Sequence, residues 1–389
     1  MTTAPPFDPG AVAARVEEFV RTRVIAYEKD PRLGSHGPSD ELVRELRALA
    51  REAGVLTPHV LSDGEFLSHR EMAPVFRAAG LSPLGPVALN IAAPDEGNMV
   101  LLRHVASAVQ QTRFLSPLIE GRIRSAFLMT EPAEENGAGS DPSMLRTRAR
   151  KEQGQWVVTG RKAFITGFVG AGCGIVMAMT DMGPTMFLIE LPHPAVRLER
   201  VFNTLDGSMP GGHALVTIEN LPVSEEDVLG EVGEGFRYAQ IRLAPARLTH
   251  CMRWLGACMR ADEIATEYAT RRHAFGKSLI EHEGVSFMLA DNRIDLKMSE
   301  LMINWCAEVL DQGVGGTVES SMTKVAVSEA LFRVSDRCVQ VMGGTGIASD
   351  TVVQQVFREM RAFRVYDGPT EVHRWSIARK IARSVLTKT

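Results

Sequence analysis

The sequence predicts a mainly α-helical protein with a β-sheet domain in the middle of the chain. Apolar residues recur at helical spacing up to about residue 125 and again from about residue 237. Between these regions, short runs rich in β-branched residues are separated by Gly, Pro, Asp and Asn, which is typical of strands and turns. The 389 residues exceed what one hydrophobic core usually organises, so we expect two or three structural units.

The first helical region begins with a recognisable helix start. Ser39, followed by two acidic residues, is typical of an N-cap, and Gly54 is typical of a helix end. One face of this helix should be apolar, with Leu42, Leu46, Leu49 and Ala53. Further helices are expected over 68–79 and 97–121, separated by a Pro- and Gly-rich loop.

The middle region should form a small sheet. Its β-rich runs lie at 155–159, 174–180, 185–191 and 213–218, and a further apolar strand should open the segment 126–141. That segment continues into a Thr-Glu-Pro turn and a glycine-rich loop. By itself the loop indicates only that backbone N–H groups there could approach a ligand closely, or that the chain turns.

Long helical patterns return over 246–272, 285–312 and 318–342. The second of these carries apolar residues around much of its surface, which predicts packing on several sides. They are Phe287, Leu289, Ile294, Leu301, Trp305 and Leu310. Gly343 and Gly344 should end the third helix.

Charge and cysteine usage exclude several classes of function. The formal net charge is −4, with no block of like charges, so we expect neither nucleic acid nor an anionic membrane as partner. The five cysteines are widely spaced and form no CxxC pair, which argues against a disulfide framework and a zinc site and favours a cytoplasmic location. We also expect no export signal and no membrane span, because no suitable apolar run occurs.

Five motifs occur in order along most of the chain, and together they resemble the acyl-CoA dehydrogenase family. They are AFLMTEPAEENGAGSD at 126–141, GRKAFITG at 160–167, RRHAFGKSLIEHEGVSFMLAD at 271–291, QVMGGTGI at 340–347 and YDGPTEVHR at 366–374. PDEGNM at 94–99 and the aspartate of YDGP resemble a branch with Asp where most members have Glu. Four residues, 133–136, lengthen the first motif relative to the family.

The resemblance implies a three-part architecture with FAD bound between sheet and helices. It would comprise an N-terminal α domain (1–125), a middle β domain (126–236) and a C-terminal four-helix bundle (237–389). The implied flavin contacts are Phe127, Met129, Thr130, Gly139, Ser140, Phe164, Ile165 and Thr166. A hydroxyl at Thr130 could stabilise the negative charge of reduced flavin, and donors near Thr166 could tune N5.

The resemblance also implies contacts to the remainder of FAD. Arg272 and Phe275 match pyrophosphate- and adenine-side contacts, although an isolated arginine at a helix end more often serves the helix dipole or pairs with a surface carboxylate. Gln340, Gly343 and Gly344 match the segment that reaches the FAD of a neighbouring subunit. A homodimer or homotetramer is therefore expected.

Asp367 is the expected catalytic base. An aspartate before glycine is by itself typical of a turn, but the family has a carboxylate at this place that removes the substrate α-proton. Tyr366, Gly368 and Arg247 are the expected substrate-side residues, although Arg247 could equally form a structural ion pair. The shorter Asp would withdraw the carboxylate by roughly 1.5 Å relative to Glu.

The function that follows is FAD-dependent conversion of an acyl-CoA to its 2,3-enoyl form, as in fatty acid β-oxidation, with electrons passed to an electron-transfer flavoprotein. A flavin-dependent oxidase of the acyl-CoA or nitroalkane type is the alternative, since it too can use an aspartate base. A non-catalytic acyl-thioester-binding protein is a further alternative. The thioester could also be carried on a protein phosphopantetheine.

Overall fold

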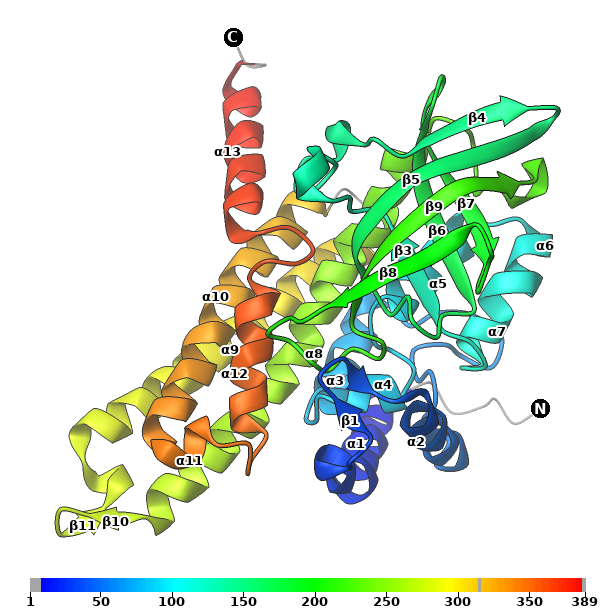
Figure 1. Cartoon of the computed structure of the whole chain (residues 1–389). Helices are drawn as coiled ribbons and strands as arrows, with labels where there is room; N and C mark the ends of the chain where they lie inside the picture. The colour runs from blue at the N-terminus through cyan, green and yellow to red at the C-terminus, as the bar shows by residue number, and fades with distance from the viewer. Residues whose placement is uncertain (1–7, 314–315, 387–389) are drawn as a thin grey trace, which may run out of the picture. The chain divides into compact units, whose positions relative to one another are not determined.

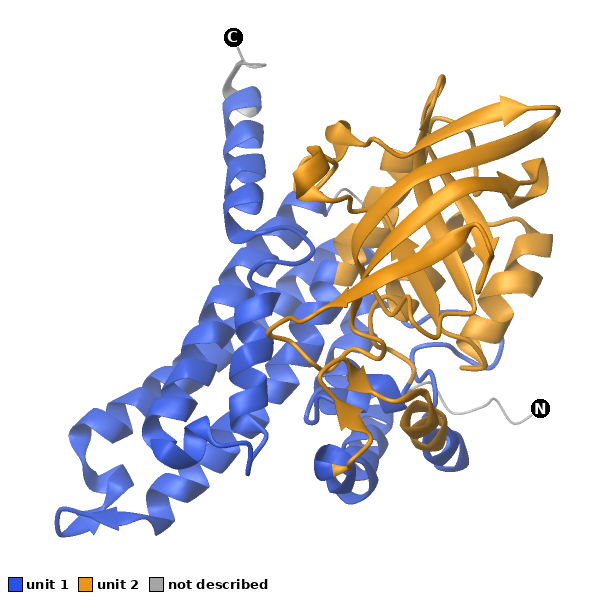
Figure 2. Ribbon diagram, viewed as in Figure 1, with its two compact units in different colours: residues 1–29, 48–89, 247–389 blue, residues 30–47, 90–246 orange. Residues whose placement is uncertain are grey.

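The computed structural model describes residues 8–313 and 316–386, and its mainly helical chain with a central sheet confirms the predicted fold class. The chain forms two compact units (Figure 2). Unit 1 comprises residues 1–29, 48–89 and 247–389, and unit 2 comprises residues 30–47 and 90–246. The division at residues 125 and 236 stays a prediction.

Unit 2 is built on a sheet whose strand order is β3-β6-β4-β5-β9-β8, with β7 paired to β6. The strands are β3 (Ser125–Leu128), β4 (Arg148–Glu152), β5 (Gln155–Thr166), β6 (Cys173–Thr180), β7 (Gly183–Glu190), β8 (Val196–Phe202) and β9 (His213–Val223). The pairings β3–β6 and β4–β6 are parallel, whereas β4–β5, β5–β9, β6–β7 and β8–β9 are antiparallel. All the predicted strands are present.

One hydrophobic cluster of unit 2 gathers alternate side chains of these strands, and β6 is buried on both of its faces. Trp156 of β5 meets Phe187 of β7 edge-on, with ring centroids 5.6 Å apart. Val158, Val176 and Ile218 are fully buried in the same cluster. This packed layer gives the adjoining loops a rigid base.

The remaining elements of unit 2 are short. They include β1 (Leu33–Gly34), β2 (Gly37–Pro38), α5 (Asp95–Val105), α6 (Ala108–Gln110), the π-helical turn Gln111–Leu115 and α7 (Ser116–Ile119). Helix α2 (Asp40–Glu52) carries residues of both units. It buries Leu42 and Leu46 as predicted, but Ala53 is exposed because the helix ends one residue earlier.

Unit 1 is helical (Figure 1). Its elements include α1 (Pro9–Phe19), α3 (His69–Ala79), α4 (Gly85–Ala88), α9 (Glu283–Asp311), α10 (Thr317–Met342), α11 (Gly344–Ile347), α12 (Val353–Phe363), α13 (Thr370–Leu386) and the ribbon of β10 (His273–Ala274) and β11 (Lys277–Ser278). Most of α8 (Gly235–Arg271) also belongs to this unit. Helix α10 packs against α9, α12 and α13.

Helix α9 is packed on only part of its surface. Leu289 and Ile303 are buried, but five large apolar side chains stay exposed within the chain. They are Phe287 (64% exposed), Ile294 (56%), Met298 (59%), Leu301 (60%) and Trp305 (40%). The predicted packing on several sides is therefore not provided by the described residues of one chain.

All five cysteines are buried as free thiols. Burial is the main cause that raises their pKa, for example to about 12 for Cys251. Of the helices in the described part of the chain, none is both long and apolar enough to cross a bilayer.

Candidate active site

Asp367 lies in the loop between α12 and α13, and the backbone of this loop is held from two sides. Its φ is +54°, an uncommon value for a residue with a side chain, and that of Gly368 is +101°. The carbonyl oxygen of Asp367 accepts a hydrogen bond from Nε of Arg247 at 3.0 Å and lies 3.1 Å from Nε2 of His373. These contacts hold the strained backbone in place.

The carboxylate of Asp367 has a partner that the sequence motifs did not indicate. Nε2 of His250 lies 3.1 Å from Oδ2 of Asp367, with the histidine side chain 5% exposed and the aspartate 22%. Arg247, His250 and Trp254 are spaced three and four residues apart, so they share one face of α8. Trp254 donates a hydrogen bond of 2.6 Å to the hydroxyl of Tyr366. These three side chains of α8 thus contact the backbone of Asp367, its carboxylate and the hydroxyl of Tyr366.

Helix α10 holds the other side of the loop. Nζ of Lys324 donates a 2.6 Å hydrogen bond to the carbonyl of Phe363 and lies over its ring, 4.4 Å from the centroid. Burial lowers the pKa of Lys324 to about 8, although the charge of Asp367 opposes this effect. Burial, together with the charges of Arg247 and Lys324, lowers the pKa of His373 to about 4. His373 is therefore neutral at physiological pH.

In a neutral His373 one ring nitrogen donates a hydrogen bond and the other accepts one. Nε2 carries the hydrogen and donates to the carbonyl of Asp367, so Nδ1 accepts from the hydroxyl of Ser321, 3.1 Å away. A Cβ on Gly368 would lie only 2.6 Å from Nε2 of His373. Gly368 is thus required by its packing against histidine as well as by its backbone angle.

The two candidate flavin motifs of unit 2 lie side by side. The N–H of Ala163 donates to the carbonyl of Thr130 at 2.9 Å, and Nζ of Lys162 donates to the carbonyl of Met129 at 3.1 Å. Lys162 also pairs with Glu131 at 3.0 Å, and both side chains are buried. The ion pair therefore holds Glu131 of the β3 motif (residues 126–141) against β5.

Glu131 organises the glycine-rich loop as well. Its carboxylate accepts hydrogen bonds from the backbone N–H groups of Ala138, Arg146 and Thr147. Gly139 and Ser140 are exposed beyond this anchor, and a Cβ on Gly139 would meet nothing within 4 Å. A ligand could therefore approach the backbone of the loop at Gly139 and Ser140, which stays a prediction.

Residues 164–166 present alternating faces. Phe164 is 54% exposed, with φ of +55°, and stacks on Phe202 with centroids 4.3 Å apart. Ile165 is 1% exposed in the sheet core, so only its backbone remains a candidate flavin contact. Thr166 is half-buried. Exposed aromatic surface, half-buried hydroxyls at Thr130 and Thr166 and the open loop suit a flat, polar-edged ring such as a flavin.

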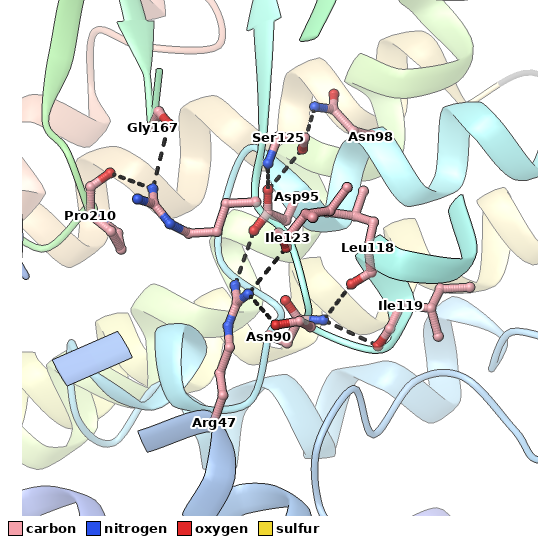
Figure 3. A network of polar contacts seen from close by, with 12 residues as sticks. Arg47, Asn90, Asp95, Asn98, Leu118, Ile119, Ile123, Ser125, Gly167 and Pro210 are labelled. Atoms are coloured by element: carbon pink, nitrogen blue, oxygen red, sulfur yellow. Dashed lines mark hydrogen bonds and ion pairs between the residues drawn. The ribbon is translucent and has the colours of Figure 1, made fainter. Parts of the chain in front are cut away.

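The PDEGNM segment anchors the start of β3 through a buried network (Figure 3). Asp95 accepts hydrogen bonds from Nη2 of Arg47 and from the N–H and hydroxyl of Ser125. Asn98 donates to the same hydroxyl and accepts from Nε of Arg242, whose guanidinium lies 4.1 Å from the ring centroid of Phe127. The network therefore connects this segment to a candidate flavin residue.

The remaining candidate residues lie at the other end of the helices of unit 1 from Asp367 (Figure 1). Arg272 directly follows α8, and Phe275 in the β10–β11 ribbon is 96% exposed. Gln340, Gly343 and Gly344 are exposed where α10 ends. At 1.5 Å per helical residue, Arg272 lies roughly 37 Å along α8 from Arg247.

The sequence patterns of two known domains match this chain. The acyl-CoA dehydrogenase middle domain matches residues 126–211, and the acyl-CoA dehydrogenase C-terminal domain matches residues 233–382. The chain belongs to the acyl-CoA dehydrogenase family. It is therefore an FAD-dependent oxidoreductase that acts in acyl-CoA dehydrogenation, as the motifs indicated.

Individual relatives agree with this assignment. A probable acyl-CoA dehydrogenase of Mycobacterium tuberculosis is 34% identical over 94% of this chain and 93% of its own. Acyl-CoA dehydrogenase family member 11 of Gallus gallus is 32% identical, but this chain spans only 50% of its length. A putative acyl-CoA dehydrogenase structure from Mycobacterium abscessus has a TM-score of 0.88 at 32% identity, covering 98% of this chain and 100% of its own.

Proposed function

We propose that this acyl-CoA dehydrogenase oxidises the Cα–Cβ bond of an acyl-CoA with Asp367 as its base. The observation that carries the proposal is the support around this carboxylate. Its backbone is held by Arg247 and His373, and its Oδ2 faces the buried His250. A carboxylate that has no role in a reaction does not require such support at a strained position.

In the proposed reaction the α C–H bond breaks and its proton passes to Asp367, while the electron pair forms the Cα–Cβ double bond. FAD, when bound, supplies the acceptor for the hydride that leaves Cβ. Asp367 must be ionised beforehand, and the neighbouring charges of Arg247 and Lys324 interact favourably with that form. Tyr366 is fixed by Trp254 next to the base and so limits where the thioester can lie.

The residues that would hold the flavin are those of the adjacent β3 and β5 motifs. The side chains of Phe127, Met129, Thr130, Phe164 and Thr166, the backbone of Ile165 and the loop at Gly139 and Ser140 would meet the ring. A hydroxyl such as Thr130 stabilises developing negative charge at a flavin edge.

The test of the base is anaerobic flavin bleaching by a panel of acyl-CoAs. Asp367→Asn keeps the shape but removes the proton acceptor, so FAD should stay bound while bleaching by the best substrate slows at least about a thousandfold. Asp181→Asn, at an exposed turn of unit 2, is the matched control and should bleach at the parent rate. Reduction of Asp367→Asn at the parent rate would overturn the assignment.

We further propose that electrons leave through an electron-transfer flavoprotein. The rival acceptor is oxygen, which an aspartate-base oxidase of this fold would use. Turnover in air with substrate but no added acceptor separates the two. Little peroxide and a strong stimulation by an electron-transfer flavoprotein support the dehydrogenase, whereas stoichiometric peroxide supports the oxidase.

We propose that the working enzyme is a homo-oligomer whose copies complete each other's FAD sites. If Asp367 faces the flavin ring, Arg272 of the same chain is too far along α8 to reach the pyrophosphate of the same FAD. A second copy can supply it. The exposed apolar side chains of α9, spaced by seven, four, three and four residues, form one helical face suited to that contact.

A further inference from the structure

Three residues of unit 2 form a hydrogen-bonded chain that the proposed reaction does not use. Thr166 ends β5 and pairs in the sheet with His213, the first residue of β9. Nδ1 of His213 lies 2.9 Å from Oγ1 of Thr166, and Nε2 lies 2.7 Å from Oδ2 of Asp206. The side chains of His213 and Asp206 are only 14% and 8% exposed, so bulk water competes little for these contacts.

The carboxylate of Asp206 determines which imidazole nitrogen carries hydrogen. Burial raises the pKa of Asp206, but its interaction with His213 and its further hydrogen bonds outweigh burial, and the pKa lies below its usual value. An ionised carboxylate only accepts hydrogen bonds, so Nε2 of His213 must donate. In a neutral imidazole Nδ1 is then an acceptor, and the hydroxyl of Thr166 donates to it.

A hydroxyl that donates to His213 offers only its lone pairs in other directions. N5 of a flavin accepts a hydrogen bond in the oxidised state, whereas in the reduced state it carries hydrogen and donates. Lone pairs at Thr166 therefore complement the reduced state and leave oxidised N5 without a donor from this side chain.

We propose that His213, oriented by Asp206, is a positioning residue that makes Thr166 a hydrogen-bond acceptor at the flavin and so favours the reduced cofactor. The inference rests on the proposed function for one point, the location of Thr166 beside N5. It assigns roles to His213 and Asp206, which none of the family motifs contains.

The test is a double-mutant cycle read by the flavin midpoint potential, measured by reductive titration without acyl-CoA. The holoenzymes are the parent, His213→Phe, Thr166→Val and the double variant. Without the imidazole, the Thr166 hydroxyl can donate to oxidised N5. His213→Phe should therefore lower the ratio of reduced to oxidised flavin at fixed potential about tenfold, equivalent to ~30 mV for a two-electron couple. In the Thr166→Val background the same substitution should leave the potential unchanged.

A second variant guards against misfolding of His213→Phe. Asp206→Asn retains shape, and its amide can donate to Nε2, which places the hydrogen on Nδ1 and frees the hydroxyl of Thr166. The potential should fall in this variant too. His193→Phe, in the same unit, is the matched control and should not shift it.

Two results would overturn the inference. An equal shift from His213→Phe with and without the Thr166 hydroxyl would mean that His213 acts by charge or packing alone. Histidine nitrogen NMR of the parent that finds hydrogen on Nδ1 but not on Nε2 of His213 would contradict the assigned direction. Because no acyl-CoA is present, the cycle gives its answer whether or not Asp367 proves to be the base.

Discussion

At the scale of single residues, the most important contact of the candidate site that no sequence motif contains is made by His250. The motif YDGP indicated Asp367 but not the histidine beside its carboxylate. His250 shares a face of α8 with Arg247, which lies 120 residues from Asp367 in the sequence and donates to its carbonyl. A contact between a helix and a distant loop leaves no local spacing pattern. His250 could therefore not be recognised from the sequence, whereas Asp367 and Arg247 were named through the family resemblance and their roles stay predictions.

Replacing His250 should slow proton removal while leaving FAD bound. His250→Leu loses the contact that fixes Oδ2 of Asp367, and misplacing a catalytic group by about 1 Å can cost on the order of a hundredfold in rate. The rate of flavin bleaching should therefore fall roughly 10- to 100-fold. His250→Gln, which retains an N–H donor, should recover part of the rate, and His104→Gln should match the parent. Equal rates for His250→Leu and the parent would remove His250 from the mechanism.

His373 should make stability depend on pH on the acid side. Its pKa falls from 6.5 to about 4 on folding, so between these values the unfolded chain binds a proton that the folded chain does not. The free energy of unfolding should therefore decrease as the pH falls from 6.5 towards 4. Urea unfolding at several pH values should show a shallower dependence for His373→Gln. An unchanged slope would mean that His373 is protonated in the folded protein.

At the scale of elements, apolar periodicity predicted long helices and buried strands well. The expected helices at 246–272, 285–312 and 318–342 correspond to α8, α9 and α10, although α8 begins eleven residues earlier, at Gly235. Strands β4 and β8 went unpredicted: the exposed side chains of β4 are all charged, and β8 lies at an edge of the sheet and exposes Arg197 and Arg200. Polar edge strands lack the apolar run that marks a buried strand.

The buried pair of Lys162 and Glu131 should be a major stabilising contact between β5 and the β3 motif. Lys162→Met leaves a buried carboxylate without its cation, which should cost about 3–5 kcal/mol in the free energy of unfolding. The double variant Lys162→Met/Glu131→Gln should recover part of this loss. Denaturant unfolding measures both.

The matched control is Lys151→Met. Lys151 pairs with Glu225 at the same 3.0 Å, but both side chains are about half exposed. Such a pair is worth at most about 1 kcal/mol. A similar loss in the two lysine variants would contradict the role assigned to burial.

At the scale of the whole molecule, the open face of α9 links assembly to cofactor binding. Ile294→Lys/Leu301→Lys places two charges in the proposed contact, so the oligomer should dissociate and release FAD, because Arg272 of a second copy is lost. Sedimentation velocity and flavin content measure the two effects. Val109→Lys, at a position that is 74% exposed in unit 2, should leave both unchanged. A monomer that retains FAD would contradict shared sites.

Because Arg247 and Arg272 lie far apart along α8, the fraction of the enzyme that is active should depend on its concentration. A site completed by another copy loses its cofactor when copies separate, so specific activity should decline on dilution rather than stay constant. The amount synthesised would then set the active fraction as well as the total. Adding excess FAD to a diluted sample would restore turnover only as far as it drives the copies to reassociate.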